Sequence, residues 1–220
     1  MRARFAWLLV VLSTLAAGAP QRHVIAFGKW ATVKWIPDAA PAAPVEMKVR
    51  PLFVDGRLRE YTLGEPHEVT DRLLVVQQAY RLNDALAGER GPQWKWQRGG
   101  WLLVERATGR VRRLALPGFD PAHSQASWYR DYAAYCGVSE EDGKAYAVVA
   151  QLGRRKPLLR QELAASAGEM GCAAPLWQRA PARVTFTAGG DKRSFEVHGH
   201  AVDPAPPTET DDEPKTEENP

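Results

Sequence analysis

The chain has 220 residues, a formal net charge of +3 at pH 7 and two cysteines. After the first nineteen residues no segment is apolar for long enough to cross a bilayer, which excludes a protein with several membrane-spanning helices. The sequence also lacks Gly-x-Ser-x-Gly, His-Glu-x-x-His and Cys-x-x-Cys motifs and a phosphate-holding glycine loop, so the commonest classes of catalytic site are not indicated.

Residues 1–19 have the three parts of a secretory signal peptide. Arg2 and Arg4 give a positively charged start, Phe5–Leu15 form an apolar run, and Ala16–Ala19 supply a small-residue end. The apolar run is shorter than the roughly 20 residues that a membrane-spanning helix needs. We therefore expect a periplasmic or secreted protein with no transmembrane span after the signal is removed. The abundance of Arg, Ala, Pro and Gly favours a bacterial source with a GC-rich genome.

Strand patterns dominate residues 20–202, which we expect to form a single β domain. Runs of alternating or β-branched residues on either side of turn residues predict four hairpins. The hairpins cover residues 45–63, 94–116, 132–152 and 184–202, and further strands are predicted over 23–36, 72–82 and 157–163. The Asp55-Gly56 turn is the strongest local signal, because both central residues of such a turn must tolerate a positive φ.

Two segments have a helical alternative. Residues 121–136 fit a strand covered on both faces, but one stripe of a helix also fits, formed by Trp128, Tyr132, Tyr135 and Cys136. Residues 161–168 fit a short helix. With at most one or two short helices, the predicted fold class is all-β, with antiparallel sheets arranged as a sandwich or as part of a propeller.

A weak internal repeat raises the propeller alternative. Residues 56–63 (GRLREYTL) match residues 109–116 (GRVRRLAL) at an offset of 53. A spacing near fifty residues is typical of propeller blades. A closed propeller usually needs at least four blades, however, and two stacked antiparallel sheets fit about 180 residues more comfortably.

The same repeat supplies candidate binding residues. Arg57 and Arg59 share one strand face, as do Arg110 and Arg112, because side chains alternate along a strand. Stacked copies would form a stripe of guanidinium groups that can hold carboxylates or phosphates bidentately. Residues 154–156 (Arg-Arg-Lys) add a third basic turn. The alternative is a solvated strand face. For an exported protein the expected partner is an anionic envelope polymer or another envelope protein, and not nucleic acid.

Trp94 and Trp96 are a second candidate binding pair. They fall on one face of a predicted strand, where exposed indole rings would suit stacking on sugar rings or on a protein partner. The alternative is core packing, which Lys95 and Gln97 favour, because their alternation with the tryptophans implies one wet face and one buried face.

The two cysteines, Cys136 and Cys172, are predicted to form a disulfide, because an exported protein meets an oxidising compartment. It would stabilise the fold by roughly 3–4 kcal/mol in the chain-entropy model. A reactive thiolate needs a nearby base, and no histidine lies within ten residues of Cys136. His198 and His200 could begin a metal site, but the spacing indicates no third ligand. We expect no metal and no cofactor.

Residues 203–220 have a different composition. They carry seven carboxylates, one lysine and five prolines, and we expect them to form a disordered acidic tail. Residues 20–202 carry 26 Lys and Arg against 19 Asp and Glu, a net charge of +7. A basic body and an acidic tail can attract each other or meet different partners.

The leading functional hypothesis is an exported, non-catalytic binding or interaction module, with no catalytic residues assigned. The alternative is an envelope-acting hydrolase whose carboxylates come from separate loops, with Glu105, Asp120, Asp131 and Glu162 as candidates. A hydrolase would bring two carboxylates together in a concave pocket, whereas a binding module would expose an arginine or tryptophan surface.

Overall fold

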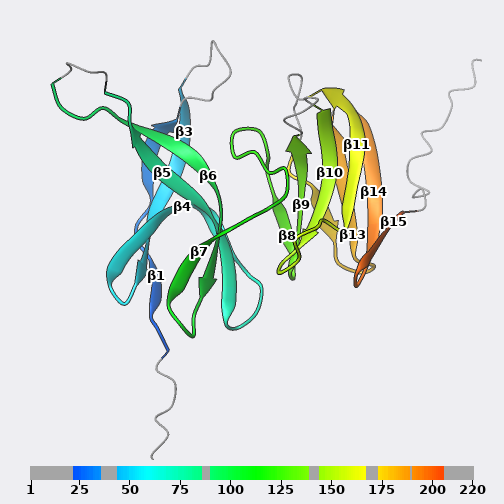
Figure 1. Ribbon diagram of the computed structural model, residues 1–220, viewed down its shortest axis with the longest axis horizontal. Coiled ribbons are helices and arrows are strands. Elements are labelled where there is room, and N and C mark those ends of the chain that lie inside the picture. The colour runs from blue at the N-terminus through cyan, green and yellow to red at the C-terminus, as the bar shows by residue number, and fades with distance from the viewer. Residues whose placement is uncertain are drawn as a thin grey trace, which may run out of the picture.

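The computed structural model describes residues 22–35, 44–85, 90–138, 144–166, 173–188 and 190–205. These residues form fifteen β-strands in three sheets and contain no helix (Figure 1), which confirms the all-β prediction. Nowhere in the described part does a helix have the length and hydropathy that crossing a bilayer demands.

The first sheet contains the seven strands of the N-terminal half. They are β1 (Ile25–Phe27), β2 (Ala31–Trp35), β3 (Val45–Val54), β4 (Arg57–Glu68), β5 (Leu73–Asn83), β6 (Trp94–Glu105) and β7 (Arg110–Leu114). Strands β2 to β6 follow one another around a closed ring, in which β2 pairs with β3 and, through Trp35 and Trp96, with β6. The ring has an odd number of alternating strands, so its first and last strands are parallel where they meet.

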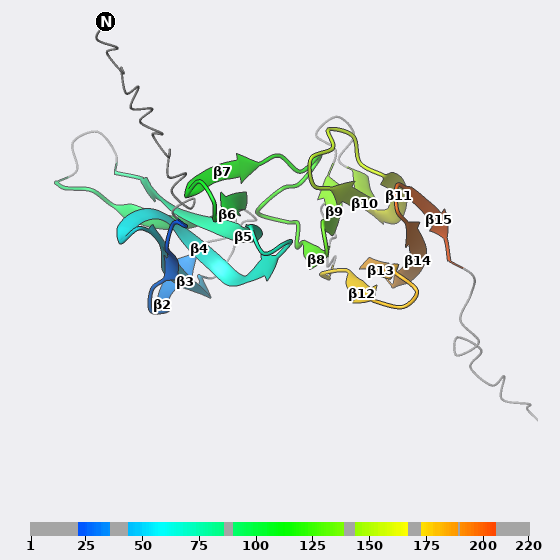
Figure 2. The ribbon, with the colours of Figure 1, turned by 90° about the horizontal axis from the view of Figure 1, so that it is seen from below.

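The other two sheets form a sandwich. One consists of β8 (Ser127–Tyr129), β9 (Tyr132–Val138), β10 (Lys144–Gln151) and β11 (Leu159–Ser166), and the other of β12 (Leu176–Gln178), β13 (Arg183–Ala188), β14 (Asp191–His198) and β15 (Ala201–Pro204). Neighbouring strands in both sheets are antiparallel, and the sheets lie side by side in Figures 1 and 2. Their facing side chains, including Tyr132, Ala147, Phe186 and Phe195, make one buried cluster.

The segment around Tyr132 is a tight hairpin. Strands β8 and β9 are joined by Arg130 and Asp131, and Arg130 adopts a φ of 53°. The helical alternative for residues 121–136 is therefore wrong, although both faces of β9 are covered as the strand alternative predicted. Tyr132 faces the third sheet, whereas Tyr135 faces the opposite way and donates a 2.8 Å hydrogen bond to the carbonyl oxygen of Pro117.

Four further predictions need correction. Residues 161–168 do not form a helix in their described part, which lies in β11. Residues 23–36 form two strands, because β1 pairs with the end of β3 and β2 with its beginning. The two copies of the repeat lie in β4 and β7 of a single sheet, so their spacing does not mark two blades. Strand β15 also extends to Pro204, two residues into the segment expected to be tail.

The first sheet is covered on both faces. Antiparallel partners share a face, so Leu74 and Val104 lie on one face while Val75 and Leu103 lie on the other. Leu74 and Val104 belong to a cluster that β1 covers with Ile25. The continuous apolar runs of β5 and β6 follow from this double burial.

The second face of the first sheet packs against the sandwich half. Val75, Trp101 and Leu103 form a cluster with residues of the segment that runs from β7 to β9. This segment connects the two halves in the chain (Figures 1 and 2). Trp101 and Trp128 meet edge to face at 5.2 Å between ring centroids. Each half therefore has its own core, and a further apolar cluster joins them.

Candidate functional site

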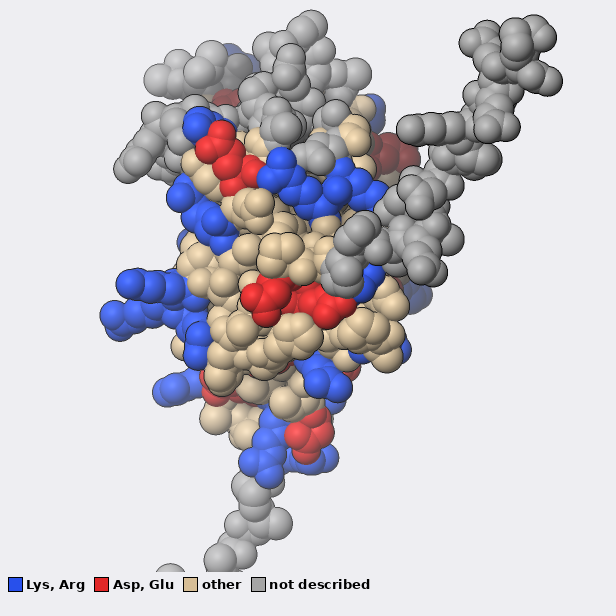
Figure 3. All heavy atoms as spheres, turned by 90° about the vertical axis from the view of Figure 1, so that its right-hand side faces the viewer, with Lys and Arg blue, Asp and Glu red and all other residues tan. Residues whose placement is uncertain are grey.

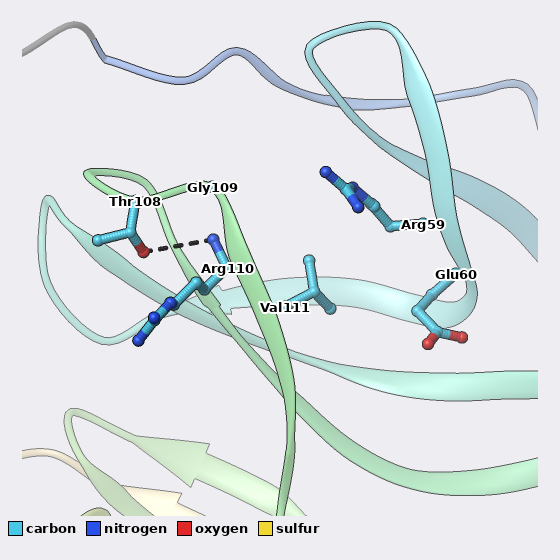
Figure 4. A pocket seen from close by; sticks show the side chains of 6 residues that line it. All are labelled: Arg59, Glu60, Thr108, Gly109, Arg110 and Val111. Atoms are coloured by element: carbon cyan, nitrogen blue, oxygen red, sulfur yellow. Dashed lines mark hydrogen bonds between the residues drawn. The ribbon is translucent and has the colours of Figure 1, made fainter.

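The arginines of the repeat are divided between two hollows. Arg59 and Arg110 line one of about 440 Å³, together with Glu60, Thr108 and Val111 (Figure 4). The guanidinium groups of Arg59 and Arg110 point apart in Figure 4, so they do not converge on one ligand atom. Gly109, which ends the turn directly before β7, has a φ of 64°.

Arg112 lines a different hollow, of about 380 Å³, which we call the junction hollow because it lies between the two halves. Its other basic residues are Arg113, also from β7, and Arg154 and Arg155, from the turn between β10 and β11. Leu114, Ala115, Leu116, Pro117, Leu152 and Gly153 complete the lining. The structure thus brings the third basic turn of the sequence to β7, whereas Arg57 lines neither hollow.

Local structure holds both walls of the junction hollow. Gly153 has a φ of 85°, a conformation that favours glycine, and the N–H of Arg154 donates to the carbonyl oxygen of Gln151 at 3.1 Å. On the other wall, the buried hydroxyl of Tyr135 holds the carbonyl of Pro117. The arginines therefore extend from backbone that is fixed at both sides.

The junction hollow has an excess of positive charge. All four guanidinium groups belong to exposed residues, and only Arg112 has a carboxylate neighbour, with its Nε 3.3 Å from Glu105 Oε1. Within the described ranges, no carboxylate lies at ion-pair distance from Arg113, Arg154 or Arg155. An excess of three exposed guanidinium groups favours an anionic ligand at this position.

Comparison with known proteins adds no assignment. No family model, curated protein or solved structure matches this chain. The site has to be interpreted from its own geometry.

Trp94 and Trp96 share a face of β6, since their partners on β5 are Asn83 and Arg81. Trp96 packs into the core of the ring, edge to face with Tyr61, while Trp94 is 54% exposed. The guanidinium of Arg81 lies 5.2 Å from the ring centroid of Trp94 and 5.5 Å from that of Trp96. Trp96 is therefore a core residue and Trp94 a surface residue, and the guanidinium of Arg81 lies near both indole rings.

The four candidate carboxylates each have a partner of their own. Glu105 accepts from Thr108 and Arg112, Asp120 lies 2.7 Å from His123, Asp131 accepts from Gln151, and Glu162 pairs with Lys144. The hollow beside Arg59 and Arg110 has one carboxylate in its lining, Glu60, and the junction hollow has none.

The histidines of the predicted strand end lie at a turn. β14 ends at His198, Gly199 has a φ of 59°, and His200 follows it. His198 lies 3.4 Å from Glu196, and His200 contacts the side chain of Gln151 at 3.1 Å. Among the described residues, no group of three or more His, Cys, Asp or Glu side chains is placed to hold a metal ion.

Cys136 is buried in β9 at 2% exposure. Cys172, the signal segment 1–19 and residues 206–220 lie outside the described residues. The disulfide, the signal peptide and the disordered tail therefore stay predictions.

The pattern of the sequence missed Arg113. Arg113 directly follows Arg112 in β7, and the alternation of a strand places consecutive side chains on opposite faces. Because β7 is paired on one side only, by β6, both residues can reach the hollow at its free edge. An edge strand cannot be recognised from its own residues, so no local signal would have found this pair.

Proposed function

We propose that this protein is an exported, non-catalytic binding module that holds an anionic ligand in the junction hollow. The observation that carries the proposal is the convergence of Arg112, Arg113, Arg154 and Arg155 around one hollow with an apolar lining. Guanidinium groups bind carboxylates and phosphates bidentately and keep their charge at any physiological pH.

The arrangement along β7 supports a polymer as the ligand. Arg110 lines one hollow and Arg112 and Arg113 the next, so basic side chains continue along the strand. At about 3.3 Å per residue, Arg110 and Arg113 are roughly 10 Å apart along β7. Successive anionic groups of an envelope polymer can then bind successive arginines, which an isolated ion cannot do.

The distribution of charge supports a local site. On the face in Figure 3, Lys and Arg side chains lie at the left margin, across the upper part and at the bottom, and Asp and Glu form small separate groups, one of them near the centre. A uniformly basic surface would attract any polyanion without a defined site. The hydrolase alternative lacks comparable support, because its candidate carboxylates are held by separate partners.

The test replaces all four junction arginines with alanine (Arg112, Arg113, Arg154 and Arg155). A matched control removes the same charge from exposed arginines elsewhere (Arg22, Arg72, Arg90 and Arg179). Retention on immobilised heparin and mobility in gels that contain polygalacturonate are measured at several salt concentrations. These probes separate a sulfated polymer from one with carboxylates alone.

We expect the junction variant to lose its salt-sensitive retention, while the control variant keeps most of it. Salt matters because exposed charges are screened beyond about 10 Å at 0.1 M ionic strength. Equal losses in both variants would mean that net charge alone attracts the polymer. Unchanged retention of the junction variant would overturn the proposal.

A further inference from the structure

A separate hollow, of about 550 Å³, lies over β2, β3 and β4. Its lining residues are Trp30, Thr32, Lys48, Gly64 and Glu65, and we call it the Trp30 hollow. Trp30 is 41% exposed, although it directly precedes β2 and follows β1 by only three residues. A large indole that remains exposed beside a hollow is a candidate contact surface.

Arg50 holds the indole in place. Its guanidinium carbon lies 4.3 Å from the ring centroid of Trp30 and 4.5 Å from that of Phe27, so the cation is stacked between two rings. Nη2 of Arg50 also donates to Glu65 Oε2 at 2.7 Å, and its side chain is only 12% exposed. Because Arg50 covers one face of the indole, the exposed area of Trp30 belongs to its edge and its other face.

An irregularity of β4 places Glu65 at this site. The pairing of β4 with β5 shifts register between Leu63 and His67, and Gly64 has a φ of 61°. The carbonyl oxygen of Gly64 accepts a long hydrogen bond of 3.5 Å from Arg50. β-bulges commonly redirect a side chain next to a functional site, and here the bulge directs Glu65 toward Arg50 and the hollow.

The rim of the hollow offers both hydrogen-bond donors and acceptors. Thr32 and Lys48 are directly opposite each other on β2 and β3, and Glu65 lies across from them in the same lining. Glu65 is paired with Arg50, so Lys48 leaves this site with a net charge of one, against an excess of three at the junction hollow. The hollow combines an aromatic ring with polar rim groups and only a small net charge.

We propose that the Trp30 hollow binds one sugar ring of a neutral, linear β-1,4-linked glycan. The pyranose rings of such a chain present C–H groups on their flat faces and equatorial hydroxyl groups around their edges. The C–H face matches the open face of Trp30, and the hydroxyl groups match Thr32, Lys48 and Glu65. This site is independent of the anion site, and either can fail without the other.

The test titrates the full-length mature protein with triacetylchitotriose and with cellotriose by isothermal calorimetry. We expect saturable binding of at least one trisaccharide, and a loss of affinity of about tenfold or more in Trp30→Ala. Trp30→Phe keeps an aromatic face and should stay within about threefold of the wild type. Trp94→Ala is the matched control, since Trp94 is exposed but lies outside this hollow.

A second variant distinguishes a loss of binding from a folding defect in Trp30→Ala. Lys48→Ala changes an exposed rim residue, and we expect it to lower affinity by about threefold or more with an unchanged circular dichroism spectrum. The variant without the junction arginines should bind both trisaccharides like the wild type. The proposal is overturned if neither trisaccharide binds the wild type at millimolar concentration, or if Trp30→Ala binds as well as the wild type.

Discussion

Glu196 and Arg183 show how a single residue pair responds to pH. They lie directly opposite each other on β14 and β13, with Arg183 Nη2 2.7 Å from Glu196 Oε1. The hydrogen bond from Arg183 lowers the pKa of Glu196 below its ordinary value of 4.5, and His198 acts in the same direction. The folded-state pKa is therefore lower than the unfolded one. The pair stabilises the fold above the unfolded pKa, and that stabilisation is lost as the pH falls through the folded pKa.

We predict that Glu196→Gln is less stable than the wild type near neutral pH and that the difference shrinks below about pH 4.5. A glutamine cannot ionise, so it resembles the protonated glutamate at every pH. Urea unfolding between about pH 7 and pH 3 measures the difference. Glu46→Gln, at an exposed position of β3, is the control. A difference that stays constant over the whole range would contradict the role of ionised Glu196.

At the scale of single residues, the sequence indicated Arg112 as a binding residue but not its neighbours in space. Arg154 and Arg155 formed a visible basic turn, yet nothing in the sequence relates that turn to β7. Trp30 could not be selected either, because Arg50 and Glu65, which define its surroundings, come from two other strands. A binding residue is recognised by its neighbours, and only the fold supplies them.

The two copies of the repeat allow an experiment at the scale of elements. Gly56 and Gly109 each end a hairpin turn with a positive φ, of 73° and 64°. A Cβ on Gly56 would have no neighbour within 4 Å, whereas one on Gly109 would lie 2.8 Å from His23 Cγ and 3.0 Å from Val54 Cγ1. The turns thus share their backbone requirement and differ in packing.

We predict that Gly56→Ala costs about 1–2 kcal/mol of unfolding free energy, the usual penalty for a left-handed residue. Gly109→Ala should cost about 1–3 kcal/mol more, because the added methyl group overpacks a closed contact. Urea unfolding of both variants measures the difference. Equal losses would show that His23 and Val54 move away from Gly109 without cost.

Hairpins were the elements that local sequence predicted best. The Asp55-Gly56 turn and the runs around it specify β3 and β4, because turn residues and alternation act over a few positions. Residues 161–168 were ambiguous for the same reason, since a short apolar pattern fits a helix or a strand until a partner strand is known. In the structure β10 is that partner.

At the scale of the whole molecule, Trp128 couples the two halves. It belongs to β8, meets Trp101 of β6 edge to face, and stacks on His67 of β4 at 5.9 Å. Nε2 of His67 is also 2.7 Å from the carbonyl oxygen of Arg130. The indole nitrogen of Trp128 is buried without a hydrogen-bond partner among the described residues, so its contribution here is packing.

We predict that Trp128→Ala lowers the free energy of unfolding by about 2–4 kcal/mol, less than the loss for a fully buried aromatic side chain, because Trp128 is partly buried. It should also broaden or split the thermal transition, because the halves keep separate cores and lose part of the cluster that joins them. Differential scanning calorimetry measures both effects. Trp94→Ala, which removes an exposed indole, should change neither, and a single sharp transition in Trp128→Ala would argue against coupling through Trp128.

The sequence by itself determined the all-β class and the hairpins, and one of its two alternatives for residues 121–136 was a strand covered on both faces. These properties depend on alternation, β-branching and turn residues, which act over a few neighbouring positions. The tertiary structure alone decided that β2 to β6 close into a ring and that a sandwich packs against it. It also decided which arginines meet at the junction hollow and which residues surround Trp30. The pairing of distant strands depends on how the side chains of whole strand faces pack together. These contacts join residues far apart in the sequence, so no single stretch of sequence determines them.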